Sequence, residues 1–205
     1  MPAVVAAAGT GAPLMSAHLG WFIIDGVSEL TPYAAARELL CDVVVVMGVS
    51  ASGKSTVAAV VAQRLGWAHI DADDYHPQAN IDKMSAGQPL TDDDRVPWLE
   101  AIRADLDRRR SAGESVVLSC SALKRKYRDV LRGGPARVHF VHLRASRDVL
   151  VARLDERSGH FFPGDLVDSQ LAALEVPGSD EAALIVDATD DAADIASRVV
   201  NAWRA

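Results

Sequence analysis

The chain has 205 residues, of which 49% are hydrophobic and 24% are charged, and its formal net charge is −7. This length fits one domain with a core of ordinary depth, and the composition is typical of a soluble globular protein. The acidic balance argues against a nucleic-acid partner, because such binding depends on a surplus of clustered Lys and Arg.

Cysteine content and hydropathy indicate a cytoplasmic protein without a membrane partner. The two cysteines, Cys41 and Cys120, offer no disulfide framework, which favours a reducing compartment. No apolar run reaches the ~18 residues of a membrane span. No Lys or Arg precedes Arg37, so a secretory signal is not expected.

The first 40 residues differ from the rest of the chain. They are rich in Ala, Gly and Pro and carry no recognisable chemistry. We expect residues 1–40 to be a disordered or loosely packed extension, followed by a single domain over residues 41–205.

A complete phosphate-binding motif, Gly-Val-Ser-Ala-Ser-Gly-Lys-Ser, occupies residues 48–55. The β-branched run at 42–47 before it predicts a buried strand, and the Ala-rich segment 56–65 after it predicts a helix. Such a loop directs backbone N–H groups and a helix N-terminus at phosphate oxygens, while Lys54 reaches the β and γ phosphates and Ser55 can hold Mg²⁺. We therefore expect ATP to contact the residues Gly48, Val49, Ser50, Ala51, Ser52, Gly53, Lys54, Ser55 and Thr56.

Strand-like and helix-like segments alternate after the loop. Further strands are predicted at 67–71, 116–120, 138–143 and 183–187, and helices at 96–111, 123–131, 147–156, 165–173 and 192–203. With the first strand, this pattern predicts an α/β fold in which a five-stranded parallel sheet carries helices on both faces. In such sheets ligands bind beyond the carboxyl ends of the strands.

Carboxylates follow the second predicted strand. If the strand persists, Asp71 and Asp73 lie on the same side and face the phosphate loop. One carboxylate can then hold a metal-bound water beside Ser55, and the other can accept the proton of an attacking hydroxyl. We assign the metal role to Asp71 and the acceptor role to Asp73. A solvated acidic turn is an equal alternative on these residues alone.

Several blocks of the chain closely resemble the gluconate kinases, small P-loop enzymes related in fold to shikimate and adenylate kinases. Besides the phosphate loop, the matching blocks are Asp71-Ala72-Asp73 with His76-Pro77, Asn80 to Met84, Pro89 to Trp98, Cys120 to Lys124 with Tyr127-Arg128, and Gly159 to Phe162. The resemblance runs from about Val43 to the C-terminus. It implies a P-loop kinase fold with a mobile lid, ATP and Mg²⁺ as cofactors, and phosphorylation of D-gluconate at its 6-hydroxyl.

Three alternatives remain open beside this assignment. One is a P-loop kinase for another small acceptor, such as shikimate or a nucleoside monophosphate. Another is a non-catalytic nucleotide sensor that binds ATP without turnover. For the assembly, a homodimer is an open alternative to a monomer.

Four cations in the matching blocks fit an anionic substrate. Lys83, Arg95, Lys124 and Arg128 follow the second and third strands, and a sugar acid requires such charges. Lys124 and Arg128 are four apart, so they are expected to share one helical face. His76 either bonds a gluconate hydroxyl or caps the turn before the following proline.

The segment after the fourth strand is predicted to close over the nucleotide. In the related kinases this region is a lid, and we expect Arg153 and Arg157 to neutralise transition-state charge and His160 to contact substrate. A surface helix with ordinary ion pairs is the alternative. The resemblance also implies that Asp187, after the fifth strand, belongs to the loop that borders adenine.

Two features depart from the usual pattern. The strand at 116–120 ends in Ser119-Cys120 and lacks the usual Walker B aspartate, so Asp71 is expected to substitute for it. Ala51 stands where many relatives have Gly, which matters only if that position requires a positive φ.

Overall fold

The computed structural model describes residues 42–133, 137–158 and 164–204, except for the side chains of 157–158, 164–165 and 204. The extension expected at residues 1–40 lies outside the described residues. Within them, no helix is both long and apolar enough to cross a bilayer.

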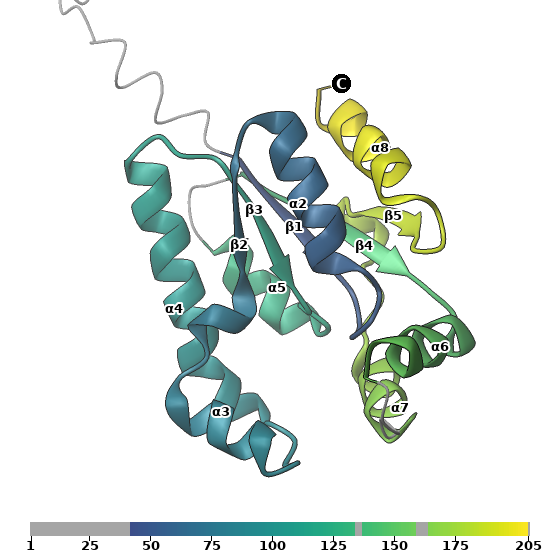
Figure 1. The fold of residues 1–205 in the computed structure, drawn as a ribbon. Coiled ribbons are helices and arrows are strands. Elements are labelled where there is room, and N and C mark those ends of the chain that lie inside the picture. The colour runs from purple at the N-terminus through teal and green to yellow at the C-terminus, as the bar shows by residue number, and fades with distance from the viewer. Residues whose placement is uncertain (1–41, 134–136, 159–163, 205) are drawn as a thin grey trace, which may run out of the picture. The chain divides into compact units, whose positions relative to one another are not determined.

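The centre of the fold is one sheet of five parallel strands (Figure 1). The strands are β1 (Asp42–Met47), β2 (Ala68–Asp71), β3 (Val116–Cys120), β4 (Arg137–Arg144) and β5 (Leu184–Asp187). Their spatial order is β2-β3-β1-β4-β5, so β1 is the middle strand and all six of its residues are buried. The prediction of a five-stranded parallel sheet is confirmed.

Helices cover both faces of this sheet (Figure 1). They are α2 (Lys54–Leu65), α3 (Gln78–Ser85), α4 (Asp92–Ser111), α5 (Arg125–Arg132), α6 (Arg147–Ser158), α7 (Gly164–Ala173) and α8 (Ala192–Arg204), with 3₁₀ turns η2 (Ala72–Tyr75) and η3 (Ser179–Glu181). The helices α2 and α8 pack on one face and α4 and α5 on the other.

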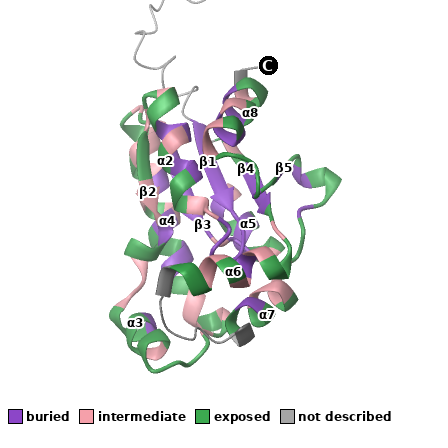
Figure 2. Ribbon diagram, turned by 45° about the vertical axis from the view of Figure 1, so that its right-hand side comes forward, coloured by how far each residue is buried: buried purple, intermediate pink, exposed green. Residues whose placement is uncertain are grey.

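The two-residue period of β1 creates both cores. Val43, Val45 and Met47 pack toward α4 and α5, whereas Val44 and Val46 pack toward α2 and α8. Figure 2 shows the resulting buried band along the sheet, with exposed residues on the outer helix surfaces. Because both faces are covered, polar chemistry is confined to the strand ends.

The helix predicted to start at Val96 in fact begins at Asp92. Thr91 accepts a hydrogen bond from the Asp94 N–H, and the Asp94 side chain accepts one in return from the Thr91 N–H. This capping box starts the helix one turn earlier and leaves Pro97 inside it. The helix α3 was not predicted; it begins directly after Pro77.

Candidate active site

The phosphate loop connects the middle strand to α2 at the carboxyl edge of the sheet. Gly48 has a φ of 148°, and a Cβ there would lie 2.9 Å from the Leu143 carbonyl oxygen, so only glycine fits. Gly53 has a φ of 93° and caps α2. Lys54 Nζ donates to the Val49 carbonyl at 2.9 Å, which places the ammonium against the loop.

Ala51 is in the left-handed region, with a φ of 61°. From the sequence, an alanine in place of glycine was expected to matter only if this position has a positive φ, and it does. An L-residue with a Cβ is strained in this conformation by about 1–2 kcal/mol. The loop therefore carries strain at a buried position that lies between Ser50 and Ser52.

A carboxylate network lies beside the first turn of α2. The Ser55 hydroxyl donates to Asp71 Oδ2 at 2.9 Å, and the Ser119 hydroxyl donates to the same oxygen at 2.7 Å. His69 Nε2 lies 3.1 Å from Ser119 Oγ. Burial alone would raise the pKa of Asp71, but hydrogen bonds from the Asp73 N–H, Ser119 and Ser55 outweigh it and lower that pKa.

This network brings together the two residues assigned to the metal, Ser55 and Asp71. Ser119, on the strand that lacks the usual Walker B aspartate, stands opposite Asp71 in the strand register and donates a hydrogen bond to it. The contributions of Ser119 and His69 were not predicted. Their signal in the sequence is only their place in adjacent strands, which requires the register to be known.

The strand does not persist to Asp73, so the prediction that Asp71 and Asp73 lie on the same side of one strand is wrong. The strand ends at Asp71, whose side chain caps η2 by accepting from the Asp73 N–H at 3.1 Å. Asp73 therefore lies on a 3₁₀ turn, and its side chain is exposed. The short turn still keeps both carboxylates at the carboxyl edge of the sheet.

A polar surface continues from η2 across α3 to the start of α4. The His76 ring stacks on Trp98 with 4.7 Å between ring centroids, and burial lowers the pKa of His76. Asn80 donates to the Asp94 carbonyl at 2.8 Å and lies 3.4 Å from His76 Nδ1. Trp98 Nε1 donates to the Ala72 carbonyl at 2.6 Å, so this surface is anchored to η2.

Two of the predicted substrate cations have carboxylate partners. Lys83 Nζ lies 2.6 Å from Asp94, and Lys124 Nζ lies 2.8 Å from Asp92. The hydrogen bond from Lys83 is the largest cause that lowers the pKa of Asp94 to about 2. Lys124 and two neighbours likewise lower the pKa of Asp92. Both lysines therefore have a carboxylate partner within the protein, and their role in binding substrate stays a prediction.

Arg95 is different, because no carboxylate in the described parts of the chain pairs with it. Its Nη1 donates to the Leu90 carbonyl at 2.6 Å and to the Thr91 carbonyl at 3.2 Å, and the guanidinium carbon lies 5.7 Å from the Tyr127 ring centroid. Lys124 Nζ lies 5.8 Å from the same ring. Arg95 and Lys124 thus share one region of the surface.

The structure removes Arg128 from the predicted substrate-binding residues. Its side chain and that of Glu181 are each 1% exposed, and Nε and Nη2 donate to the two Glu181 oxygens at 2.6 and 2.7 Å. Its Nη1 donates to the carbonyls of Ala122 and Leu123. The expected shared face with Lys124 fails because Lys124 is the N-cap of α5, while Arg128 points into the protein.

Arg153 and Asp187, both predicted to lie near the nucleotide, are found by the phosphate loop and by the loop after β5, respectively. Arg153 Nη2 donates to the Ala188 carbonyl at 2.7 Å, and Nη1 lies 3.5 and 3.4 Å from the carbonyls of Ala51 and Ser52. Asp187 accepts from the Thr189 N–H at 2.9 Å, and its pKa is lowered by the Thr189 hydrogen bonds. Arg153 therefore joins the phosphate loop to the loop after β5.

The predicted lid residues are only partly covered by the structure. The Arg157 side chain and His160 lie outside the described residues, so their assigned roles remain predictions. The flanking helices α6 and α7 pack on the phosphate loop through Val49, Leu150 and Val167. An unpredicted residue of α7, Gln170, bonds Ser50.

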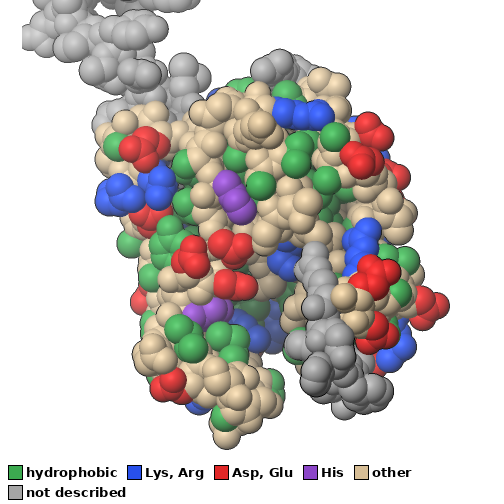
Figure 3. All heavy atoms as spheres, viewed as in Figure 1, with side chains coloured by type: hydrophobic (Ala, Val, Ile, Leu, Met, Phe, Trp, Pro, Cys, Tyr) green, Lys and Arg blue, Asp and Glu red, His purple; other side chains and the backbone are tan. Residues whose placement is uncertain are grey.

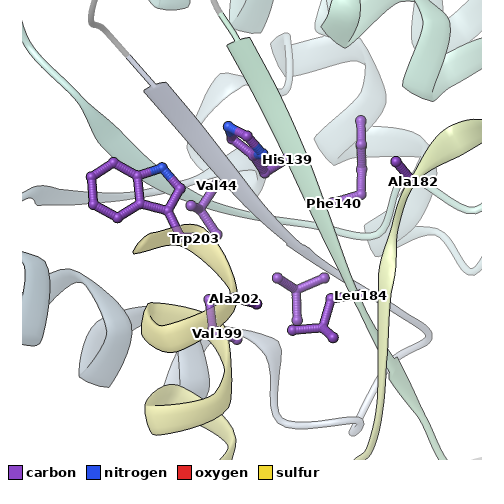
Figure 4. Close-up of a pocket in the computed structure, with 9 residues that line it drawn as sticks. Val44, His139, Phe140, Ala182, Leu184, Val199, Ala202 and Trp203 are labelled. Atoms are coloured by element: carbon purple, nitrogen blue, oxygen red, sulfur yellow. The ribbon is translucent and has the colours of Figure 1, made fainter. Parts of the chain in front are cut away.

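The site surrounds a recess rather than a closed cavity. Acidic and basic side chains gather around the recess between the α3–α4 part and the α6–α7 part of the surface (Figure 3). A separate small apolar pocket lies at the opposite end of the sheet, between β4, β5 and α8 (Figure 4). Its lining is mostly apolar and includes Val44, Leu184 and Trp203, with the ionisable side chain of His139 beside them.

Comparison with known proteins identifies the family. An AAA domain family model matches residues 43–177. The chain is 55% identical over 137 residues to the gluconokinase of Gluconobacter oxydans, covering 67% of this chain and 77% of that protein. It is also 44% identical to the thermoresistant gluconokinase of Escherichia coli, covering 69% of this chain and 81% of that protein.

Solved structures agree with this relationship. A gluconokinase from Sinorhizobium meliloti is 44% identical, with a TM-score of 0.70 over 80% of this chain and 95% of that one. An unliganded sugar kinase from a Janibacter species is also 44% identical, with a TM-score of 0.74 over 79% of this chain and 94% of that one. The range of the family model, residues 43–177, includes the phosphate loop, Asp71 and Asp73, and the recess cations Lys83, Arg95 and Lys124. The chain belongs to the gluconokinase family.

Proposed function

We propose that this chain transfers the γ-phosphoryl group of ATP to the 6-hydroxyl of D-gluconate, giving 6-phospho-D-gluconate and ADP. The observation that carries this proposal is the recess itself. The phosphate loop lies beside Asp71 and Asp73, and Arg95 and Lys124 lie together near the Tyr127 ring. Family membership specifies the acceptor, since the fold alone serves many acceptors.

The donor set fits a nucleotide with Mg²⁺. The described residues contain no cluster of three or more His, Cys, Asp or Glu side chains that could hold a metal alone. Mg²⁺ suits this situation, because it commonly binds one or two protein oxygens and takes its other ligands from water and phosphate. The Ser55 hydroxyl and the Asp71 carboxylate, 2.9 Å apart, would supply those protein oxygens. When bound, the ion would neutralise charge on the phosphate oxygens.

The protein contributes mainly position and charge. Loop N–H groups and the Lys54 ammonium hold the phosphates, and Arg153 supports the loop from its outer side. Asp73 positions the acceptor hydroxyl and accepts its proton. The hydroxyl oxygen then forms the new bond to the γ-phosphorus as the bond to the bridging oxygen of ADP breaks.

Arg95 supports an acidic acceptor over a neutral sugar. Lys83 and Lys124 are already paired with carboxylates, so neither needs a substrate anion for charge balance. Among the described residues, Arg95 donates hydrogen bonds only to carbonyl oxygens, and its guanidinium can donate two parallel bonds to a carboxylate. We therefore assign recognition of the gluconate carboxylate to Arg95, with Lys124 beside it.

An acceptor panel tests the proposal. ADP release is measured in a coupled assay with D-gluconate, D-glucose, shikimate and AMP at equal concentrations, with MgATP alone as the blank. We expect turnover with gluconate and a much lower kcat/KM with the others. A kcat/KM for another acceptor at or above that for gluconate would replace the assignment with a different small-molecule kinase. Nucleotide binding without turnover on any acceptor would favour a sensor.

A further inference from the structure

Gln170 of α7 makes two hydrogen bonds to one residue of the phosphate loop. Its Oε1 accepts from the Ser50 backbone N–H at 2.7 Å, and its Nε2 donates to Ser50 Oγ at 2.9 Å. The two residues are 120 positions apart in the chain, and both contacts are partly buried. A side-chain amide is suited to this pairing because it has an acceptor and a donor on one rigid group.

The Gln170 contact is one of several contacts that α6 and α7 make with the phosphate loop. Val49 packs in an apolar cluster with Leu150 of α6 and Val167 of α7. On the other side, Arg153 of α6 reaches the carbonyls of Ala51 and Ser52. Four consecutive loop residues, 49–52, are therefore held by α6 and α7. The strained φ of Ala51 lies inside this segment, where surrounding contacts are needed to maintain it.

We propose that Gln170 is a positioning residue for the phosphate loop: by fixing Ser50, it keeps the loop in the conformation that receives the triphosphate. The inference rests on the proposed function in taking ATP as the ligand of this loop. Gln170 contacts the loop rather than the reacting atoms, so it acts through Ser50. Its removal should weaken nucleotide binding and leave recognition of the acceptor on the α3–α5 surface unchanged.

The test replaces Gln170 by Met, which keeps the side-chain length but has neither the acceptor nor the amide donor. Calorimetry measures the Kd of a non-hydrolysable ATP analogue with Mg²⁺, and steady-state assays give KM for each substrate and kcat. We expect the Kd of the analogue to rise about tenfold, as the loss of two hydrogen bonds implies, and KM for gluconate to change less than about twofold. The matched control is Ser169→Ala, one position earlier on α7 at an exposed site.

A double-mutant cycle with Ser50→Ala tests whether the effect passes through Ser50. That change removes the Oγ contact, so Gln170→Met should then weaken the analogue less than it does in the parent. An unchanged or tighter Kd in Gln170→Met would overturn the proposal, the tighter value showing that Gln170 competes with phosphate. A lower melting temperature with no change in Kd would overturn it too. Failure of the parent to phosphorylate gluconate would refute the proposed function, whereas the Kd ratio would still decide the role of Gln170.

Discussion

Lys54 lies in the loop where its ammonium contacts a backbone carbonyl of the same loop, and not the apolar core. We predict that Lys54→Met abolishes turnover while the fold remains intact, because the ammonium stabilises charge that develops on the transferred phosphoryl group. ADP release and thermal melting measure the two effects. Activity within about tenfold of the parent would contradict the several kcal/mol expected from such a contact.

At Ala51 we predict a substitution that stabilises the protein. Glycine at a φ of 61° removes strain of about 1–2 kcal/mol, while its greater freedom in the unfolded chain costs about 0.4–1 kcal/mol. We expect Ala51→Gly to raise the free energy of unfolding by up to about 1.5 kcal/mol in urea titrations. The control is Ala112→Gly, where φ is −86° and no strain exists to relieve. A loss of stability in Ala51→Gly equal to that of the control would refute the strain.

Arg95 provides the residue-level test of acceptor recognition. We predict that Arg95→Gln raises KM for gluconate at least about tenfold and changes KM for ATP little, because a charged hydrogen bond to the substrate is lost. Arg108→Gln is the control, since Arg108 lies further along the same helix and pairs with Asp105. An equal rise in both KM values for Arg95→Gln would place Arg95 outside the acceptor site.

Among the elements, α5 is held to the rest of the protein by a buried ion pair of Arg128, a residue that the sequence analysis assigned to substrate binding. Arg128 connects α5 to η3 through Glu181, and removal of Arg128 leaves a buried carboxylate without its main partner. We predict that Arg128→Ala lowers the free energy of unfolding by about 3–5 kcal/mol, measured by urea denaturation. Replacing both residues by apolar ones, as in Arg128→Met with Glu181→Leu, should recover part of that loss.

The matched control for this pair is Arg125→Ala. Arg125 lies on the same helix, and its partner Asp180 is exposed, so the change should cost less than about 1 kcal/mol. A higher KM for gluconate in Arg128→Ala at unchanged stability would restore the substrate role predicted from the sequence.

Elements set by local patterns were predictable, and contacts between distant elements were not. The strand, loop and helix around residues 42–65 follow from a β-branched run, glycine spacing and an Ala-rich segment, each readable within a few positions. By contrast, the partners of Arg128 and Gln170 lie 53 and 120 positions away. Nothing in the spacing distinguishes a buried arginine from one that faces a substrate. The pairing of the recess lysines was missed for the same reason.

At the scale of the whole molecule, the net charge is −7, but several carboxylates form ion pairs with Lys or Arg. Asp94, Asp105 and Glu181 each have a pKa lowered to about 2 in the folded chain. Glu181 is the most enclosed, with a side chain 1% exposed against 18% for Asp94 and 14% for Asp105. Glu181 should therefore contribute to the pH dependence of folding with the least screening by solvent among these three carboxylates.

The sign of that dependence follows from the direction of the shift. Hydrogen bonding to Arg128 is the largest cause that lowers the pKa of Glu181 from 4.5 to about 2. Between these values the unfolded chain binds more protons than the folded one, so the stability from Glu181 is complete above pH 4.5 and is lost as the pH falls toward 2. The full contribution of Glu181 to the free energy of unfolding is about 3 kcal/mol, at about 1.4 kcal/mol per pKa unit.

We predict that the free energy of unfolding of the parent falls between pH 6 and pH 2.5 by about 2.5 kcal/mol more than that of Glu181→Gln. The variant is less stable at neutral pH, but it lacks the titrating group, and the comparison concerns only the slopes. Urea denaturation at a series of pH values measures both proteins, and Asp180→Asn serves as the control at an exposed carboxylate beside Arg125. Parallel pH profiles for the parent and Glu181→Gln would show that the buried pair does not control acid unfolding.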